Sequence, residues 1–402
     1  MARMEHVVFV GFWGVADPLT TASFLPTMEL FRRMGYAGRM TLATVERGAT
    51  VDRSTLPEWL DHVPLMASRL PVRAASRALD LVALPRQLER ALRGGPVSLF
   101  VARSTLAGSI PLALGKYASV PSIVESVEPH TEYMVHCGNW SPRSLAARVG
   151  GAVERAVLRR AAGIITVSER YAARLRAEGL GAAHIHVTPC TVDLQRFMYS
   201  PSDRAHVRAE LGWGADDLVA VYLGKFGGMY LDELAHRAFA EFLRWSGERG
   251  RLLVLTATPE GEVRAGLARQ CVDQERVRVL KAAHADVPAY LSAADMAFAL
   301  YKGTPSSAYL SPVKNGEYWA SGLPVIMTRG VADDSALIEQ EPMAGALFDP
   351  TGDDLVQALE QVKDTLASPG QRERTMVFAR LHRSRDLMAR TYHDLLTELG
   401  LV

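Results

Sequence analysis

The residues best suited to chemistry lie between Ser311 and Ile326, where a lysine and a glutamate follow the start of a predicted helix. This helix begins at Pro312, a position at which a missing N–H costs nothing, and its free amides can bind an anion. Lys314 lies in the first turn, where the helix dipole disfavours a cation, so a negative partner is expected there. Glu317 lies three residues further on the same face, and its carboxylate can accept hydrogen bonds from two ribose hydroxyls. Together these groups suit a nucleoside diphosphate, and an ordinary surface Lys–Glu pair is an equally open interpretation.

A second candidate cation follows the strand that we predict over 218–223. Lys225 comes directly after Gly224 and is followed by Gly227 and Gly228. Glycines let a backbone approach phosphate closely. We therefore expect Lys225 and Lys314 to clamp a diphosphate and to stabilise it as a leaving group without a metal ion. The alternative for Lys225 is a lysine in a loop that faces solvent.

In the first half of the chain, polar residues and glycines follow two predicted strands. Gly11 and Gly14 lie at the end of the first strand, where the chain could pass close to a ligand, although a plain tight turn explains them as well. His130, with Glu128 beside it, follows the strand predicted over 121–126. We expect these two side chains to act directly on a substrate, with Glu132 as a further carboxylate. Two interpretations are equally open for Tyr133, His136 and Trp140. Their side chains could line a pocket for an acceptor substrate, or they could pack in the core.

Short apolar, β-branched segments alternate with helical patterns along the whole chain, which predicts βαβ units and parallel sheets in an α/β fold. The strands expected in the first half are 6–12, 40–45, 97–102, 121–126, 163–167 and 184–188, and the helices 22–34, 107–117, 143–161 and 168–179. The stretch 64–93 is helical in propensity. In the second half we expect strands 218–223, 251–256, 276–280, 295–300, 323–327 and 345–348, and helices 231–247, 260–270, 286–293, 313–321 and 353–366.

The chain of 402 residues is too long for one ordinary core, so two domains are expected. Periodicity is lost from 188 to 208, the best candidate for a linker. We predict an amino-terminal domain over 1–195, a donor domain over 205–370, and a carboxy-terminal helical segment over 371–402 that crosses back to the first domain. Ligands of such open sheets bind at the carboxyl ends of the strands, so a central cleft between the domains is expected.

Composition narrows the class of protein further. Apolar residues make up 48% and charged residues 22%, a normal globular balance. The three cysteines, Cys137, Cys190 and Cys271, form no CxxC pair, which indicates a reducing compartment and neither a disulfide framework nor a zinc site. No leader and no apolar run of about 18 residues is visible. These features predict a cytoplasmic protein.

The net charge of +1 hides an uneven distribution. Residues 1–200 carry 23 Lys and Arg against 16 Asp and Glu, whereas residues 201–402 carry 22 against 28. The arginines that stand out in the first half are Arg69, Arg73, Arg77, Arg86, Arg90, Arg93, Arg143, Arg148, Arg155, Arg159 and Arg160. They indicate a solvated surface or a face that holds the protein to an anionic membrane or a phosphorylated acceptor. Nucleic acid is not expected, because no aromatic or glycine motif interleaves with them.

Motifs of other phosphate-binding and hydrolytic classes are absent, including G-x-x-x-x-G-K-[ST], H-E-x-x-H and G-x-S-x-G. No D-x-D-like pair for a metal ion sits at the end of a strand either. Asp216-Asp217 and Asp333-Asp334 fall in predicted turns, where we expect them to be solvated.

The window S-P-V-K-N-G-E-Y-W-A-S-G-L-P-V-I, residues 311–326, resembles the donor-site motif of the retaining glycosyltransferases of family 4. The segments G-I-I-T-V-S-E at 163–169 and T-P-C-T-V-D at 188–193 with Phe197 resemble two further landmarks of that family, so the likeness covers about residues 6 to 350 in order. It implies a GT-B fold of two Rossmann-like domains, a nucleoside diphosphate sugar as substrate, and no cofactor or obligatory metal. It also implies a histidine such as His130 against the donor sugar, and Ser311 and Tyr309 among the donor-binding residues.

Three departures from the family pattern are present. Many members carry a second glutamate eight residues before the ribose-binding one, where this chain has Tyr309. The contacts to the sugar are then expected from Tyr309, Ser306, Ser307 or loop amides. Leu231 stands where a second lysine follows the first strand of the donor domain, and Ala162 replaces a usual acid.

The resemblance implies retaining transfer of a sugar from a UDP- or GDP-linked donor to an acceptor hydroxyl, in surface polysaccharide or glycoconjugate synthesis. The acceptor would be a glycan, a lipid-linked molecule or a small molecule, and the protein could lie peripherally on the inner face of the membrane. Two alternatives remain open: a sugar-nucleotide 2-epimerase of similar fold, and a non-catalytic subunit that binds nucleotide sugars. The base, the sugar and the acceptor are not readable from the residues.

Overall fold

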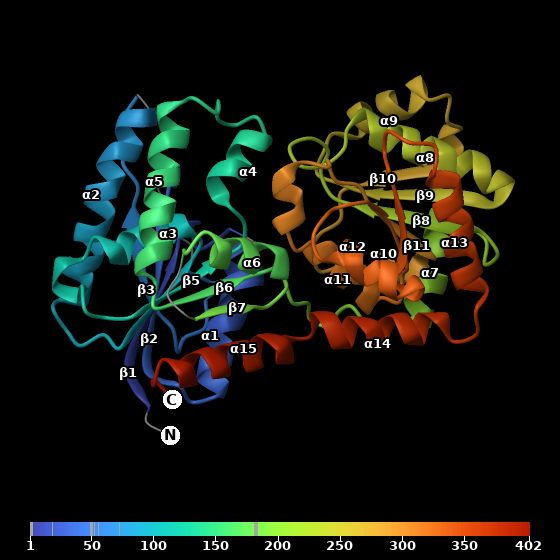
Figure 1. Ribbon diagram of the computed structural model, residues 1–402. Helices are drawn as coiled ribbons and strands as arrows, with labels where there is room; N and C mark the ends of the chain where they lie inside the picture. The colour runs from blue at the N-terminus through green and yellow to red at the C-terminus, as the bar shows by residue number, and fades with distance from the viewer. Residues whose placement is uncertain are drawn as a thin grey trace. The chain divides into compact units, whose positions relative to one another are not determined.

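The computed structural model describes residues 3–17, 19–48, 51, 53–54, 56–71, 73–180 and 184–402 (Figure 1). The side chains of residues 22, 73–75, 77 and 78 lie outside this description, so two members of the predicted basic cluster, Arg73 and Arg77, are described by their backbone alone.

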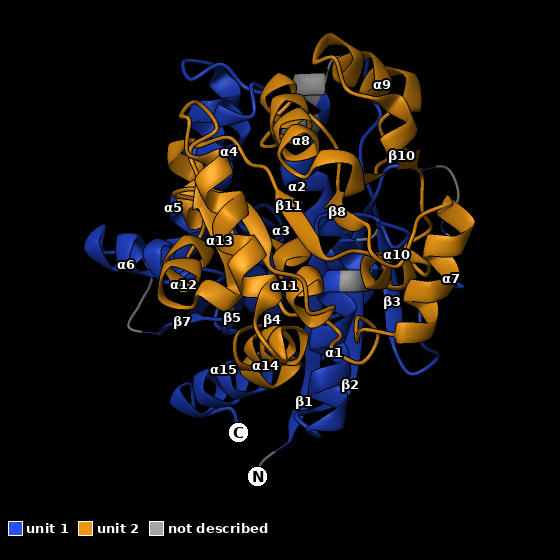
Figure 2. Ribbon diagram, turned by 90° about the vertical axis from the view of Figure 1, so that its right-hand side faces the viewer, with its two compact units in different colours: residues 1–188, 388–402 blue, residues 189–387 orange. Residues whose placement is uncertain are grey.

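The chain forms two compact units (Figure 2). Unit 1 comprises Met1–Thr188 together with Met388–Val402, and unit 2 comprises Pro189–Leu387. The change from unit 1 to unit 2 therefore falls at the start of the segment 188–208 that the sequence marks as a linker. The last residues of the chain return to unit 1.

Unit 1 is built on a parallel sheet with the strand order β3-β2-β1-β4-β5-β6-β7. Its strands are β1 (Met4–Gly11), β2 (Ala37–Glu46), β3 (Asp61–Met66), β4 (Leu99–Arg103), β5 (Ser122–Ser126), β6 (Gly163–Thr166) and β7 (Ile185–Val187). Its helices are α1 (Leu25–Arg33), α2 (Arg73–Leu92), α3 (Thr105–Leu112), α4 (His130–His136), α5 (Leu145–Arg160) and α6 (Glu169–Ala177), and most of α15 (Arg385–Glu398) belongs to it as well.

Hydrophobic side chains cover both faces of this sheet. On β1, Val7 and Phe9 pack in one cluster with residues of α1 and α15, whereas Val8 and Val10 pack in another with residues of α2 and α3. Burial on both faces is what a parallel sheet with crossover helices requires.

Unit 2 repeats this plan with the strand order β10-β9-β8-β11-β12-β13. Its strands are β8 (Leu218–Leu223), β9 (Gly250–Leu255), β10 (Val277–Leu280), β11 (Met296–Ala299), β12 (Val325–Thr328) and β13 (Gly345–Phe348). Its helices are α7 (Pro201–Leu211), α8 (Glu233–Trp245), α9 (Glu260–Arg269), α10 (Val287–Ala293), α11 (Val313–Ala320), α12 (Asp334–Gln340), α13 (Leu355–Ala367) and α14 (Gln371–Arg383). The predicted α/β class with two parallel sheets is confirmed.

In each sheet the chain changes its winding direction at one point, between β1 and β4 in unit 1 and between β8 and β11 in unit 2. Ligands of open α/β sheets bind beyond the carboxyl ends of the strands at such a point. Gly11 ends β1, and Gly224 directly follows β8, so both lie where a ligand is expected.

Four local predictions were wrong. The stretch 64–93 is not helical throughout, since β3 occupies its beginning. The loop expected after the strand 121–126 contains α4, and the end of the expected linker forms α7. The predicted helical segment 371–402 is divided at Ser384, whose backbone is extended.

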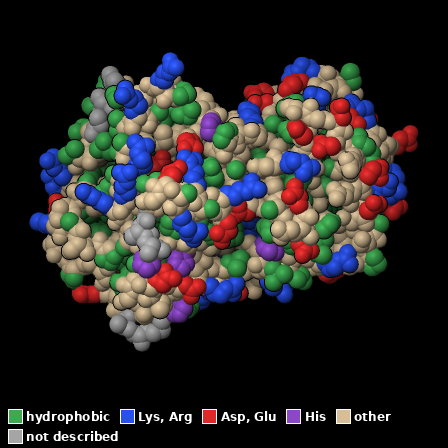
Figure 3. Space-filling model, viewed as in Figure 1, with side chains coloured by type: hydrophobic (Ala, Val, Ile, Leu, Met, Phe, Trp, Pro, Cys, Tyr) green, Lys and Arg blue, Asp and Glu red, His purple; other side chains and the backbone are tan. Residues whose placement is uncertain are grey.

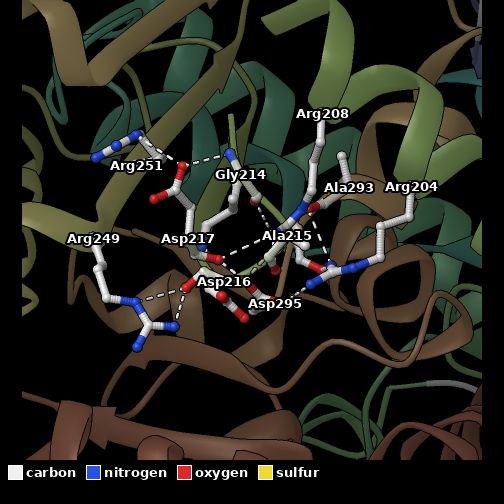
Figure 4. Close-up of polar contacts among 12 residues, drawn as sticks. Arg204, Arg208, Gly214, Ala215, Asp216, Asp217, Arg249, Arg251, Ala293 and Asp295 are labelled. Atoms are coloured by element: carbon white, nitrogen blue, oxygen red, sulfur yellow. Dashed lines mark hydrogen bonds and ion pairs between the residues drawn. The ribbon is translucent and has the colours of Figure 1, made fainter. Parts of the chain in front are cut away.

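A carboxylate network holds α7 to the sheet of unit 2 (Figure 4). Asp295, just before β11, accepts hydrogen bonds from the guanidinium groups of Arg204 at 2.7 Å and Arg208 at 2.8 Å. It also accepts one from the backbone N–H of Val219 in β8 at 2.8 Å. The side chain of Arg208 is only 3% exposed. The helix in the predicted linker is thereby tied to the amino-terminal ends of the two central strands.

Candidate functional site

The loop after β8 is shaped by Gly224 and held by the aromatic side chains around it. Gly224 has φ of 155°, in the region that favours glycine, and its N–H donates to the carbonyl oxygen of Leu255 at 2.9 Å. The buried Tyr222 hydroxyl donates to the carbonyl oxygen of Lys225 at 2.7 Å, and burial raises the pKa of Tyr222. The loop backbone is therefore fixed, while the side chain of Lys225 is exposed.

Lys314, in the first turn of α11, lies directly over Gly224. A Cβ atom at position 224 would collide with its Nζ, so a larger residue there would have to displace the lysine. The ammonium also lies 4.1 Å from the centre of the Tyr230 ring, a favourable cation–π arrangement. Within the described part of the chain, this ammonium forms no ion pair. The structure thus brings two predicted site residues together and leaves a cation without a paired carboxylate.

The amino-terminal end of α11 adds backbone donors. Pro312 occupies the capping position, and no side chain of the described residues caps the first turn. The first amides of a helix have no partner within the helix and carry a partial positive charge. Lys314 and these amides together favour an anionic ligand.

Glu317 is the buried carboxylate of this site, with an exposed fraction of 7%. Burial raises its pKa to about 7, against the opposing charges of Lys314 and Arg196. Among the described residues its carboxylate makes no hydrogen bond, and its neighbour is the His284 imidazole, with Nε2 at 3.9 Å from Oε1. A buried carboxylate without hydrogen bonds is unfavourable, which fits a group that binds a ligand.

A buried ion pair supports α11 from beneath. The Arg383 guanidinium, 1% exposed, pairs with Asp334, and the Asn315 amide donates to Asp334 at 2.7 Å. The Arg383 side chain lies across Gly316, where a Cβ atom would come within 3.2 Å of it. The expectation that Asp334 is a solvated turn residue was wrong: it begins α12 and is 2% exposed.

The hydroxyl of Ser311, a predicted donor-binding residue, is engaged by the protein. Its Oγ accepts hydrogen bonds from Arg383 at 2.6 Å and from the backbone N–H of Cys190 at 2.9 Å. Ser311 therefore connects the beginning of unit 2 to the ion pair under α11. Its contact with a donor stays a prediction.

The turn before α11 contains the residues proposed to face the sugar. Ser306 and Ser307 are fully buried, and the Ser307 hydroxyl donates to the carbonyl oxygen of Lys302 at 2.5 Å. Tyr309, at the end of the turn, is half-buried. Ser307 thus shapes the turn, which leaves Tyr309 as the better candidate for a ligand contact.

In unit 1, the loop after β1 rests on a buried carboxylate. Glu46, at the end of β2, accepts a hydrogen bond from the backbone N–H of Val15 at 2.8 Å. A Cβ atom at Gly14 would lie 2.6 Å from this carboxylate, so the close approach that requires glycine here is to a protein group. Gly11 meets only ordinary contacts, the nearest to Phe24 at 3.7 Å.

The second candidate region of unit 1 lies at the start of α4. The His130 Nδ1 is 3.4 Å from the Glu128 Oε1, and both side chains are largely buried. Glu154 of α5 accepts the backbone N–H groups of His130 at 2.8 Å and Thr131 at 3.1 Å, which caps α4. The structure therefore brings the predicted pair of His130 and Glu128 together.

The other carboxylates near this loop are engaged by the protein. Glu132 forms a two-pronged ion pair with Arg174 of α6, which lowers the pKa of that carboxyl group. Glu125 binds Arg103 at 2.5 Å and accepts the Tyr392 hydroxyl. Glu128 is thus the carboxylate of this loop that faces the His130 imidazole.

The family of the amino-terminal unit is decided by a match to a domain model. Residues 22–191 match the model described as glycosyl transferase 4-like domain. This part of the chain is a glycosyl transferase 4-like domain, and both units have the Rossmann-like parallel sheets of a GT-B fold. No curated protein matches its sequence.

Solved structures share the fold of this chain over nearly its whole length. Sucrose-phosphate synthase from Thermosynechococcus elongatus is 18% identical, with a TM-score of 0.75 over 98% of this chain and 99% of that chain. HepE from Anabaena, solved in complex with UDP-glucose, is 16% identical, with a TM-score of 0.72 over 100% of both chains. WaaG, a glycosyltransferase involved in lipopolysaccharide biosynthesis, is 14% identical, with a TM-score of 0.68 over 97% and 99%.

The sequence did not indicate two residues of this candidate site. His284, in the loop between β10 and α10, faces Glu317, and Arg196 holds it there. The region 256–284 carries no motif, and Arg196 lies almost ninety residues before its partner. His284 could have been found only from the predicted sheet, because this residue follows β10 at the same edge of the sheet as the loop after β8.

Proposed function

We propose that this glycosyltransferase moves a sugar from a nucleoside diphosphate sugar to an acceptor hydroxyl with retention of configuration and without an obligatory metal ion. The observation that carries the proposal is the unpaired Lys314 ammonium over Gly224, one helical turn from the buried Glu317. A UDP-linked donor is favoured over a GDP-linked one, because the fold is shared with HepE in complex with UDP-glucose.

The groups of unit 2 have distinct roles in this proposal. Lys314 and the first amides of α11 bind the diphosphate, Lys225 adds a second cation, and Glu317 accepts hydrogen bonds from the ribose. As the sugar leaves, charge develops on the diphosphate, and fixed positive groups at that position lower the barrier. Because these charges are already in place, no metal ion is needed for the leaving group.

In unit 1, His130 and Glu128 are the proposed catalytic residues. A carboxylate beside Nδ1 fixes the imidazole tautomer and its orientation, which suits a histidine that binds a hydroxyl. We propose that His130 contacts the transferred sugar and that Glu128 orients it. The mechanism that agrees with retention is attack on the same face of the sugar, assisted by the leaving phosphate.

A panel of donors tests the reaction type. Purified protein is incubated with UDP-, GDP-, ADP- and dTDP-linked sugars in the presence of EDTA, and nucleotide release and sugar products are measured. We expect release from UDP-sugars that depends on an acceptor and persists in EDTA. Conversion of the sugar nucleotide without an acceptor would identify an epimerase. Binding without turnover of any donor would identify a non-catalytic subunit, and strict dependence on a divalent ion would contradict the proposed role of Lys225 and Lys314.

We also propose a peripheral contact of unit 1 with an anionic membrane on the cytoplasmic side. Among the described residues no helix is long and apolar enough to cross a bilayer. Exposed arginines and large exposed apolar side chains instead occur together on α2 and α5, and Figure 3 shows both kinds on the face that is in view. The apolar members are Leu79, Leu81, Val82, Leu145 and Val149, and the basic members are Arg86, Arg90, Arg148, Arg155 and Arg159, with Arg93 directly after α2.

Vesicle sedimentation tests this contact. We expect the protein to bind phosphatidylglycerol vesicles and not phosphatidylcholine vesicles, because each basic residue near an anionic surface contributes about 1 kcal/mol. Leu81→Glu should weaken binding several-fold, whereas Leu381→Glu, at an exposed leucine of α14, should leave it unchanged. Equal binding to both kinds of vesicle would contradict the electrostatic contact.

A further inference from the structure

His284 is held in one tautomer by Arg196. The Arg196 Nη2 lies 2.7 Å from the His284 Nδ1 and 2.5 Å from the His284 carbonyl oxygen. A guanidinium has only donors, so the Nδ1 atom must be the acceptor in this contact. The neutral imidazole then carries its proton on Nε2. Burial and the nearby Arg196 charge both lower the pKa of His284, which favours this neutral form.

The protonated Nε2 faces Glu317. The distance of 3.9 Å between Nε2 and Oε1 is too long for a direct hydrogen bond. A single bridging atom fits between Nε2 and Oε1, at roughly 2.8 Å from each. One side offers a donor and the ionised carboxylate offers only acceptors. A ligand hydroxyl satisfies both at once, because it accepts from Nε2–H and donates to the carboxylate.

The positive charge of the neighbouring Lys314 indicates which part of a ligand carries this hydroxyl. Lys314 lies one helical turn before Glu317, over Gly224, and is the group that binds the diphosphate in the proposed function. A ligand with a diphosphate at Lys314 therefore presents its adjoining ribose to Glu317. The Phe197 ring packs edge-on against the His284 imidazole, with 6.2 Å between the ring centres, which restricts the imidazole further.

We propose that His284 is a specificity-determining residue that binds one ribose hydroxyl together with Glu317 and makes the site selective for ribonucleoside over deoxyribonucleoside diphosphates. This inference rests on the proposed function. A site built to hydrogen-bond a hydroxyl rejects a ligand without it strongly, because the donor and the acceptor are both left unpaired. The selectivity belongs to nucleotide binding and is independent of the sugar and the acceptor.

Calorimetric titration of the full-length protein tests the assignment with UDP, 2′-deoxy-UDP and 3′-deoxy-UDP. We expect the unaltered protein to bind one of the two deoxy forms at least tenfold more weakly than UDP. In His284→Ala the affinity for UDP should fall towards that of this deoxy form, because the hydroxyl keeps only its contact with Glu317, and the selectivity should shrink accordingly. His284→Gln keeps a side-chain donor and should restore part of the selectivity. The matched control is His206→Ala, at an exposed histidine of α7, which should behave like the unaltered protein.

Two results overturn the inference while the proposed function stands. One is UDP binding with no selectivity against either deoxy form. The other is an equal loss for all three nucleotides in His284→Ala, which would indicate a purely structural role. If UDP, GDP and ADP all fail to bind the unaltered protein, the proposed function fails as well.

Discussion

Lys314→Ala is expected to lower kcat/KM with the preferred donor by at least two powers of ten and to weaken UDP binding by about tenfold or more. The ammonium lies over Gly224 without a paired carboxylate, so its charge is available to the diphosphate. A preorganised charged donor at a leaving group typically contributes 10²–10³ in rate. Initial rates and calorimetric titration measure the two effects.

The control for this substitution is Lys363→Ala, at an exposed lysine of α13 that pairs with Glu360. It should leave the rate and UDP affinity unchanged. Lys314→Ala should also fold normally, since the lysine has no ion pair to lose within the described residues. Full donor affinity in Lys314→Ala would remove the central role that we assign to α11.

Glu317→Gln is expected to make the protein more stable and less able to bind nucleotide. The ordinary pKa of 4.5 rises to about 7 in the folded chain. The folded state then binds the proton more tightly than the unfolded state, so the free energy of unfolding falls as pH rises from about 4.5 to about 7. Above pH 7 the buried charge costs on the order of 3 kcal/mol. Glutamine carries no charge and avoids this cost.

Thermal unfolding at pH 5 and pH 8 separates this effect from a general change in packing. At pH 5 the two proteins should have nearly equal Tm, and at pH 8 Glu317→Gln should unfold several degrees higher. UDP affinity should fall at least tenfold, because the ribose loses an ionised acceptor. A lower Tm for Glu317→Gln at pH 8 would show that the carboxylate is stabilised by a protein partner.

The parts of the site that the sequence predicted lie close together in the chain. Lys314 and Glu317 belong to one helix, and helical spacing alone places them on one face. Gly224 and Lys225 directly follow a strand whose bounds, 218–223, agree with β8. His130 and Glu128 are two residues apart. In each case the short separation along the chain was sufficient to place the residues close together.

The parts that the sequence did not predict depend on contacts between distant residues. Asp334 pairs with Arg383, so what looked like a solvated turn is the buried support of α11. Arg196 and His284 meet only through the fold. The strand β3 was hidden because Pro64 interrupts its pattern; a proline is tolerated there because β3 is an edge strand.

The central claim is that unit 2 binds a nucleoside diphosphate on the loop after β8 and the beginning of α11. A crystal structure of the protein soaked with UDP tests it most directly. We predict the diphosphate within hydrogen-bond distance of the Lys314 ammonium and the first amides of α11, with a ribose hydroxyl on the Glu317 carboxylate. Ordered UDP elsewhere on the chain, with Lys314 and Glu317 untouched, would contradict the account.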